Sequence, residues 1–211
     1  MRVILASSSP RRRELLANLG VEFEVLPADI DETELPGEAP AIYVHRLALE
    51  KAATIAMRHP DALVIAADTT VDLDGRILGK PDDGDHVRAM LRDLSGRSHR
   101  VHTGVCVRIG DRVAAAVSSP EVRMITITDA MMDWYIATGE PFDKAGAYGM
   151  QGAAAVFVQE VQGSVSAVIG LPMHVVVALA NEVGIDLFAR YDPPAGKEAN
   201  TLPEASRIDA L

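Results

Sequence analysis

Apolar positions recur along this chain with two different spacings. Continuous or alternating apolar runs predict strands, whereas apolar residues three to four positions apart predict helices that bury one stripe. Strands are predicted at residues 3–5, 23–26, 61–68, 100–109, 112–118, 121–126, 153–158 and 164–169, with a hairpin over 71–78. Helices are predicted over residues 10–19, 40–58, 85–94, 128–139 and 170–183.

The run from Asp61 to Asp68 is the clearest buried strand, because it is apolar without interruption until its last residue. We expect the strand to end at Asp68. Ligands often lie at the carboxyl ends of central strands in α/β sheets, and a carboxylate there needs a partner to offset its desolvation. Asp68 is therefore either a ligand-binding residue or a cap for the turn that contains Thr69 and Thr70.

Three arginines follow a run of serines at the start of the first predicted helix. Ser9 is suited to be the N-cap and Pro10 the first helical residue. Arg11 to Arg13 would then lie in the first turn, where each cation opposes the helix dipole by roughly a few tenths of a kcal/mol unless an anion lies nearby. Helix amides, hydroxyls and guanidinium groups together favour a phosphate site, although a solvated basic turn is an equally ordinary interpretation.

Two lysines are notable for their positions. Lys51 lies on the apolar stripe of the 40–58 helix, so its side chain either snorkels past the core, which is the commoner case, or reaches into a cleft. Lys80 lies between Gly79 and Pro81, and the proline biases it towards extended backbone. A lysine on such a stiff loop is suited to hold a phosphate, although most turn lysines are simply solvated.

Two further segments carry polar candidates. The acidic loop at residues 28–34 is most simply a solvated loop, and Asp31 and Glu32 gain a role only if a hard cation binds nearby. Residues 143–152 contain glycine at every third position but lack the order of a phosphate loop or a dinucleotide fingerprint. Gln151 in this segment has an amide that both donates and accepts, as recognition of a base edge requires.

Composition and charge narrow the function classes. The chain has 211 residues, 48% of them hydrophobic, and its 20 lysines and arginines against 30 aspartates and glutamates give a net charge of −10. Such an acidic protein is a poor general binder of nucleic acid or of an anionic membrane, which makes the local basic cluster more informative.

Cys106 is the only cysteine, so an intrachain disulfide and a cysteine zinc site are excluded. His99 and His102 would point to opposite faces of a strand, so we assign them no metal.

The two ends of the chain carry little chemistry. The N-terminal apolar run is too short for a signal peptide, and nothing approaches a membrane span, so we expect a soluble cytoplasmic protein. From Asp192 onward the chain is rich in proline, alanine, glutamate and lysine, which predicts a poorly ordered tail.

Four blocks of the sequence, taken together and in this order, resemble the Maf family of nucleotide pyrophosphatases. They are Ala6-Ser7-Ser8-Ser9-Pro10-Arg11-Arg12-Arg13-Glu14-Leu15-Leu16, Ala67-Asp68-Thr69, Gly79-Lys80-Pro81 and Lys144-Ala145-Gly146-Ala147-Tyr148-Gly149-Met150-Gln151-Gly152. The likeness extends from about Val3 to Val183. The last block is similar to the subgroup that acts on dTTP and UTP rather than the subgroup for methylated GTP.

The resemblance implies a Maf/ITPase-like α/β fold, with two lobes around a deep cleft and a mixed, strongly twisted sheet. We therefore expect residues 1–191 to form a single domain of two lobes and residues 192–211 to be the tail. The resemblance also makes a homodimer plausible, although the sequence shows no interface.

The resemblance further implies cleavage of a nucleoside triphosphate to the monophosphate and pyrophosphate with a divalent cation, here Mg²⁺ or Mn²⁺. The expected substrates are dTTP and UTP or modified pyrimidine nucleotides. Asp68 matches the family's catalytic acidic residue, and we expect it to bind the metal together with Glu32. Arg11, Thr69 and Gln151 match positions associated with substrate choice. The residues that match other positions around the cleft are Ser7, Arg12, Glu32, Lys51 and Lys80.

Other functions use some of the same features. A non-catalytic nucleotide-binding regulator of cell division would keep the basic cluster but would not need a metal-bound carboxylate at Asp68. A phosphatase would release inorganic phosphate, and a kinase would need an acceptor and a signature that this chain lacks. Assay of pyrophosphate release from dTTP with Mn²⁺ separates these alternatives.

Overall fold

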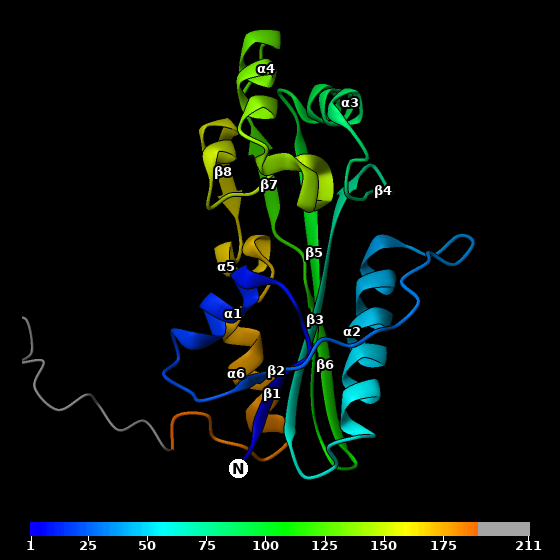
Figure 1. Cartoon of the computed structure of the whole chain (residues 1–211), viewed down its shortest axis with the longest axis vertical. Coiled ribbons are helices and arrows are strands. Elements are labelled where there is room, and N and C mark those ends of the chain that lie inside the picture. The colour runs from blue at the N-terminus through cyan, green and yellow to red at the C-terminus, as the bar shows by residue number, and fades with distance from the viewer. Residues whose placement is uncertain (190–211) are drawn as a thin grey trace, which may run out of the picture.

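The computed structural model describes residues 1–189, which are built around one eight-stranded mixed sheet (Figure 1). The order of its strands is β2-β1-β3-β5-β7-β8, with β4 beside β3 and β6 beside β5. Strand β1 pairs in parallel with β2 and with β3, and all other strand pairs of the sheet are antiparallel. The strands are β1 (Val3–Leu5), β2 (Glu24–Val25), β3 (Leu63–Leu73), β4 (Arg76–Leu78), β5 (Ser98–Ile109), β6 (Arg112–Ser118), β7 (Glu121–Met124) and β8 (Val158–Gln162).

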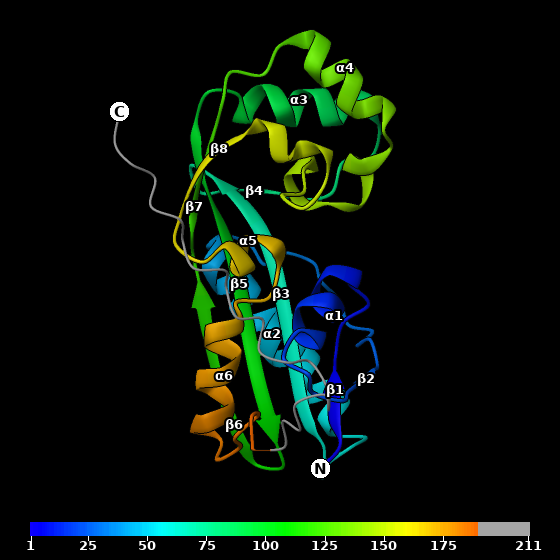
Figure 2. The same ribbon diagram turned by 90° about the vertical axis from the view of Figure 1, so that its left-hand side faces the viewer.

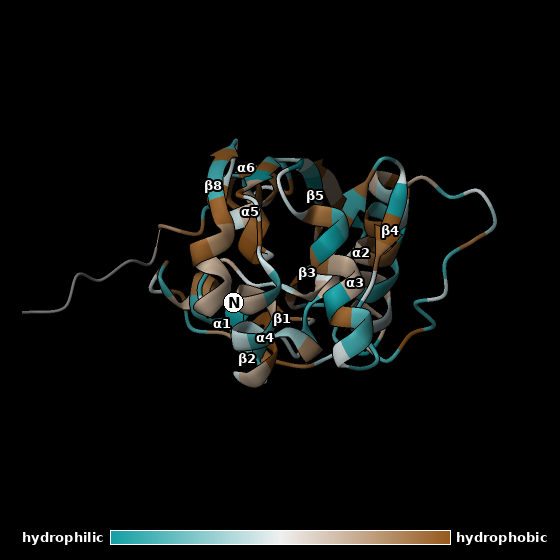
Figure 3. Cartoon of the chain, turned by 90° about the horizontal axis from the view of Figure 1, so that it is seen from above, coloured by the Kyte–Doolittle hydropathy of each residue, from teal (hydrophilic) through white to brown (hydrophobic). Residues whose placement is uncertain are grey.

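Helices cover both faces of this sheet and its far end (Figures 1 and 2). Helix α2 lies on one face and α1, α5 and α6 on the other, while α3 and α4 lie beyond them at the far end of β3 and β5. In the view from above, α3 mixes hydrophilic and hydrophobic turns, whereas α5 is mostly hydrophobic (Figure 3). The α-helices are α1 (Pro10–Ala17), α2 (Pro40–Ala56), α3 (Gly84–Leu94), α4 (Asp129–Ala137), α5 (Val165–Ile169) and α6 (Met173–Glu182), and the 3₁₀ helices are η1 (Glu140–Asp143), η2 (Ala145–Ala147) and η3 (Ala153–Phe157).

Side chains of β3 alternate between the two faces of the sheet. Val64 and Ala66 pack with α2, whereas Leu63, Ile65 and Ala67 pack in the core under α1 and α6. The alternation of side chains continues beyond the core, so Asp68 lies on the α2 side of the sheet and Thr69 lies on the opposite side. This alternation decides which partners the polar residues of β3 meet.

One edge of β3 is open over residues 66–70 in the described chain. Strand β1 pairs with β3 only at residues 63–65, and β4 pairs with it at residues 71–73. Strand β5 pairs along the other edge from Val64 to Asp72. Both faces of β3 can therefore be reached from this gap, which lies just beyond the carboxyl end of the parallel strand β1.

Most of the predicted elements are confirmed, and the fold is the expected α/β arrangement with a mixed, twisted sheet. Ser9 caps α1 by accepting a hydrogen bond from the Arg12 amide, and Thr128 caps α4 in the same way. The hairpin between β3 and β4 turns at Asp74 and Gly75, both of which have positive φ.

Three predictions about strands are wrong. The strand predicted to end at Asp68 continues to Leu73, because antiparallel pairing with β5 stabilises its polar second half. The strand predicted at residues 153–158 is η3 for most of its length, and the strand predicted at 164–169 is helix α5, capped by Ser164. These last two segments are apolar without a clear period, so their sequence pattern does not distinguish a strand from a helix.

The remaining structural expectations concern the ends and the extent of the domain. Within residues 1–189, no helix is both long enough and apolar enough to cross a membrane. The tail predicted from residue 192 lies outside the described residues. The single domain over 1–191 and the homodimer stay predictions.

Candidate active site

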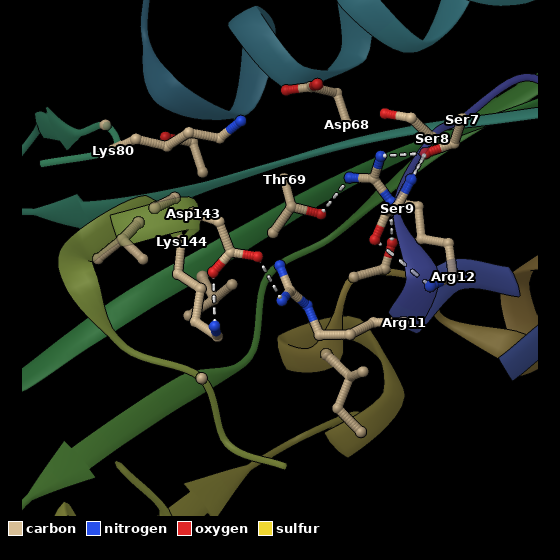
Figure 4. Close-up of a pocket in the computed structure, with 18 of the residues that line it drawn as sticks. Ser7, Ser8, Ser9, Arg11, Arg12, Asp68, Thr69, Lys80, Asp143 and Lys144 are labelled. Carbon is tan, nitrogen blue, oxygen red and sulfur yellow. Dashed lines mark hydrogen bonds and ion pairs between the residues drawn. The ribbon is translucent and has the colours of Figure 1, made fainter. Parts of the chain in front are cut away.

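A cleft of about 520 Å³ opens at the gap beside β3. Its lining brings together all nine residues that the sequence singled out, which come from the segments around β1, α1, α2, β3, β4 and η3. They are Ser7, Arg11, Arg12, Glu32, Lys51, Asp68, Thr69, Lys80 and Gln151. Figure 4 labels six of them, Ser7, Arg11, Arg12, Asp68, Thr69 and Lys80. We call Ser7, Arg12, Lys51, Asp68 and Thr69 the sheet wall of the cleft. The loop wall consists of the cleft-lining residues of segments 79–80 and 143–151, among them Lys80, Asp143, Lys144 and Gln151.

The guanidinium of Arg12, on the sheet wall, is held by three hydrogen bonds. Its Nη1 donates to Ser7 Oγ at 3.0 Å, its Nη2 to Thr69 Oγ1 at 2.9 Å and its Nε to the carbonyl oxygen of Gly170 at 2.8 Å. Burial lowers the pKa of Arg12 from its ordinary value, and the nearby Asp68 carboxylate opposes that shift. The guanidinium still has N–H groups left to bind a ligand, now fixed in direction.

A chain of hydroxyl groups fixes the orientation of Thr69. Thr103 on β5 donates to the carbonyl oxygen of Ala167 at 2.8 Å, so its Oγ1 is left to accept from Thr69 at 2.9 Å. Thr69 in turn accepts from Arg12. Each hydrogen bond from Arg12 through Thr69 and Thr103 to Ala167 therefore has a single donor and a single acceptor. This fixed series holds the guanidinium in place before a ligand binds.

Lys51 reaches into the cleft instead of snorkelling past the core. Its Nζ lies 2.6 Å from Asp68 Oδ1 and 2.7 Å from Glu32 Oε1. The Lys51 and Asp68 side chains are only 9% and 10% exposed, whereas Glu32 is 53% exposed and comes from the acidic loop. Burial raises the pKa of Asp68, and the positive charges of Lys51 and Arg12 oppose this rise.

The position of Lys51 depends on a close approach of α2 to the sheet at Gly104. Gly104 on β5 is the register partner of Asp68, and a Cβ atom there would lie 2.2 Å from the carbonyl oxygen of Val44. Only glycine leaves room for the α2 backbone at this point. The helix therefore lies close enough to β3 for Lys51 to reach the carboxylate.

The loop wall is more exposed than the sheet wall. Lys80 and Gln151 are exposed, and neither side chain has a hydrogen bond or ion pair with the residues described. The loops that carry them are joined, because the Gly146 amide donates to the carbonyl oxygen of Gly79 at 3.0 Å. Arg11 connects the two walls, since its Nη1 lies 3.6 Å from Asp143 Oδ2 (Figure 4).

Sequence reasoning assigned no role to Tyr43, Asp143 and Lys144, which also line the cleft. Lys144 lies beside Asp143, with its Nζ 2.6 Å from Asp143 Oδ1 and 2.7 Å from the carbonyl oxygen of Glu140. Tyr43 donates to the carbonyl oxygen of Glu32 at 2.9 Å, and burial, with the charges of Asp68 and Glu32, raises its pKa to about 12. A charged pair directly before the glycine-rich segment was a signal for Asp143 and Lys144, whereas nothing local pointed to Tyr43.

The two buried histidines of β5 have different partners and do not line the cleft. His99 Nε2 is hydrogen bonded to the hydroxyl of Tyr148 at 2.7 Å, and burial lowers the pKa of His99 to about 4. His102 lies between Ser119 and Asp72, at 2.7 and 3.0 Å. Tyr148 itself lines the cleft, so His99 supports the loop wall from behind.

Glu32 and Asp68 are the carboxylates suited to hold a cation here. The two carboxylates already bind one positive charge, because the Lys51 ammonium lies within 2.7 Å of an oxygen of each. No group of three or more acidic, histidine or cysteine side chains converges in residues 1–189. Two carboxylates match Mg²⁺ sites in which substrate phosphates and water complete the coordination.

Comparison with known proteins gives relatives that cover most of this chain. A family model described as "Maf-like protein" matches residues 2–183. Proteins named dTTP/UTP pyrophosphatase are 53% identical over 191 residues in Anaeromyxobacter dehalogenans and 49% identical over 191 residues in Chromobacterium violaceum, each covering 88% of this chain and 96% of the relative. A solved structure of the Staphylococcus aureus Ham1 protein has a TM-score of 0.43 at 15% identity, covering 59% of this chain and 72% of that one.

Proposed function

The chain belongs to the Maf family, and we propose that it hydrolyses dTTP and UTP to the nucleoside monophosphate and pyrophosphate. The observation that carries this proposal is the buried Asp68 carboxylate in a cleft that also presents Arg11, Arg12 and Lys80. A triphosphate brings about four negative charges, which such a cluster can neutralise even in a chain of net charge −10. Relatives about half identical to this chain carry the name of that activity.

Asp68 is proposed as the general base. It takes a proton from water as the water oxygen bonds to the α-phosphorus, and the bond from that phosphorus to the bridging oxygen breaks. Pyrophosphate leaves with the electron pair of the broken bond. Burial raises the pKa of Asp68, which makes it a stronger base than an exposed aspartate, while the Lys51 ammonium keeps it ionised.

The cations of both walls are proposed to hold the phosphates. Arg12 is already oriented by Ser7 and Thr69, so it loses little further freedom when it binds an oxygen. Lys80 and Arg11 lie nearer solvent and would stabilise charge that develops on the leaving pyrophosphate. Phosphoryl transfer depends mainly on such positioning and charge stabilisation.

A divalent cation, Mg²⁺ or Mn²⁺, is proposed to bind at Glu32 and Asp68. When bound, such an ion polarises a phosphoryl oxygen and neutralises part of the phosphate charge. Glu32 is on an exposed loop and Asp68 on a buried strand, so the pair combines an adaptable oxygen ligand with a fixed one.

Gln151 is proposed to read the pyrimidine. Its amide has both a donor and an acceptor and has no side-chain partner in residues 1–189, so it is available to a base edge. The hydroxyl of Thr69 is already shared by Arg12 and Thr103, so its effect on substrate choice would pass through the guanidinium that it holds.

Product analysis tests this function. The purified protein is incubated with dTTP, UTP, CTP and ATP in the presence of Mg²⁺ or Mn²⁺, and the products are separated. We expect nucleoside monophosphate and pyrophosphate in equal amounts, with dTTP and UTP preferred and no reaction in chelator. Nucleoside diphosphate with inorganic phosphate would contradict the proposal, and binding without any product would indicate a non-catalytic regulator.

A further inference from the structure

Gln151 lies in a segment with little regular structure, so something outside that segment must hold it. The chain between α4 and β8 forms only η1, η2 and η3, each of five residues or fewer. Gln151 itself is exposed, and a turn closed by the Gly152 amide and the carbonyl oxygen of Gly149, at 3.2 Å, contains it. The direction of its amide therefore depends on how the backbone of this turn is anchored.

The carboxylate of Glu140 anchors the chain directly after Gln151. Its Oε2 accepts from the Ala153 amide at 2.6 Å, and its Oε1 accepts from the Ala154 amide at 3.4 Å and from the Tyr135 hydroxyl at 3.1 Å. These amides begin η3, where backbone N–H groups lack partners within the helix. Tyr135 is fully buried on α4, so the carboxylate is tied to the core.

Two glycines make room for this anchor. A Cβ atom on Gly152 would lie 2.2 Å from Glu140 Oε2, and one on Gly149 would lie 2.6 Å from Lys144 Cε. The glycines on either side of Gln151 thus allow a carboxylate and a lysine stem to pack against its backbone. Glycine at these two positions is therefore required for close packing of the loop.

Glu140 also holds the neighbouring cation of the loop wall. Its backbone carbonyl oxygen accepts from Lys144 Nζ at 2.7 Å. One residue therefore contacts both the ammonium that pairs with Asp143 and the turn that carries Gln151. Since Glu140 does not line the cleft, it acts through these residues and not on a substrate.

We infer that Glu140 is a positioning residue for base recognition, which sets the Gln151 amide by clamping residues 152–154. This inference rests on the proposed function, in which Gln151 reads the pyrimidine. It assigns base selectivity to a side chain outside the cleft and leaves phosphate binding to Arg11, Arg12 and Lys80.

The test compares Glu140→Ala and Glu140→Gln with wild type, using UTP, CTP and pyrophosphate. Loss of the clamp misplaces the reading amide, so we expect Glu140→Ala to lower kcat/KM for UTP by roughly 10- to 100-fold, mainly through KM. The preference for UTP over CTP should fall by about tenfold, because an amide that no longer meets its partner ceases to discriminate. Inhibition by pyrophosphate, which has no base, should keep its wild-type constant.

Glu140→Gln retains one acceptor oxygen at the same position, so it should recover most of the selectivity. The matched control is Glu160→Ala, the same substitution on an exposed residue of the adjacent β8, which should leave every constant unchanged. If Glu140→Ala does not fold, Glu140→Asp serves in its place, because its shorter side chain withdraws the oxygens while keeping the charge.

The outcomes separate this inference from the proposed function. Unchanged selectivity in a folded Glu140 variant would overturn the positioning role alone, as would an equal loss of pyrophosphate inhibition, which indicates general collapse of the cleft. A wild-type protein that fails to prefer UTP over CTP would overturn base reading by Gln151 and the inference with it. A wild-type protein that releases no pyrophosphate from any nucleotide would overturn the proposed function itself.

Discussion

The two walls of the cleft are built in opposite ways. On the sheet wall, Arg12, Lys51 and Asp68 belong to helices and a strand, and each has at least two charged or polar partners. On the loop wall, Lys80 and Gln151 are exposed and their side chains have no partner among the described residues. Interactions between charges are stronger where water is excluded, so the rigid wall suits the chemical step.

This difference separates the consequences of substitution. A change on the sheet wall disturbs both the reaction and the packed structure around it, because the same contacts serve both. A change of Lys80 or Gln151 on the loop wall lowers kcat/KM with little effect on stability, because these exposed side chains contribute little to folding. Measuring turnover and melting temperature together therefore tells the walls apart.

The largest effect is expected from Asp68→Asn, which keeps the shape of the side chain but removes the base. Turnover should fall by roughly 10²- to 10⁴-fold, the usual contribution of a general base. The melting temperature should fall as well, because Lys51 loses the charge of its buried partner. Pyrophosphate release and thermal unfolding provide the two measurements.

Asp72→Asn is the matched control for this change. Asp72 lies four residues further along β3, outside the cleft, and pairs with His102. Its variant should retain turnover. Near-normal hydrolysis by Asp68→Asn would remove Asp68 from the mechanism and leave the sheet wall a structural feature.

Lys80→Ala tests the loop wall. Removing a phosphate-binding cation should cost about 2–4 kcal/mol of transition-state stabilisation, or roughly 30- to 1000-fold in kcat/KM. The melting temperature should not change, because Lys80 is exposed. Arg76→Ala, on β4 but outside the cleft, is the control and should leave kcat/KM unchanged. If Lys80→Ala has full activity, Lys80 is only a solvated turn residue.

The sequence could predict elements whose signals are local. Ser9 followed by Pro10 marks the start of α1, Asp74-Gly75 marks a hairpin, and the apolar stripe from Val44 to Ile55 is buried as expected. Each of these signals depends on residues within a few positions of one another. The family resemblance then gathered the candidate site residues, which the structure brings to one cleft.

The elements and site contacts that the sequence did not predict depend on contacts between distant segments. The apolar run at 153–158 reads as a strand by itself, and Glu140, thirteen residues earlier, is what binds the amides that begin η3. The stripe of α2 placed Lys51 on the apolar side but could not show that Asp68 would meet it. The continuation of β3 past Asp68 depended on pairing with β5, more than thirty residues away.

Acid should destabilise the protein through His99, which supports Tyr148. Burial lowers the pKa of His99 to about 4 from an ordinary 6.5, so the unfolded chain takes up its proton before the folded protein does. Stability is therefore lost as the pH falls from 6.5 towards 4. This group alone should cost about 2 kcal/mol between pH 7 and pH 5 and about 3 kcal/mol by pH 4.

Urea unfolding at pH 7 and pH 5 measures this loss, and the His99→Gln variant supplies the comparison. The variant should show a smaller decrease in the free energy of unfolding, because it has no proton to take up at this position. At pH 5 the protection of backbone amides against hydrogen exchange, relative to the intrinsic rate, should fall around Tyr148, which His99 supports, before it falls in β3. Equal pH dependence in wild type and variant would show that His99 titrates normally.

The smallest effect is expected from a glycine beneath the sheet wall. In Gly104→Ala the new Cβ atom meets the Val44 carbonyl oxygen at 2.2 Å, and this backbone can retreat only if α2 moves. Such overpacking typically costs about 1–3 kcal/mol, which for a chain of this length lowers the melting temperature by roughly 3–10 °C. Since α2 carries Lys51, turnover should decrease in parallel.

Gly79→Ala in the loop wall, where nothing lies within 4 Å of the added atom, should leave the melting temperature unchanged. Equal melting temperatures for the two variants would mean that α2 does not lie against β5 as described. The proposed difference between a packed sheet wall and an open loop wall would then be wrong.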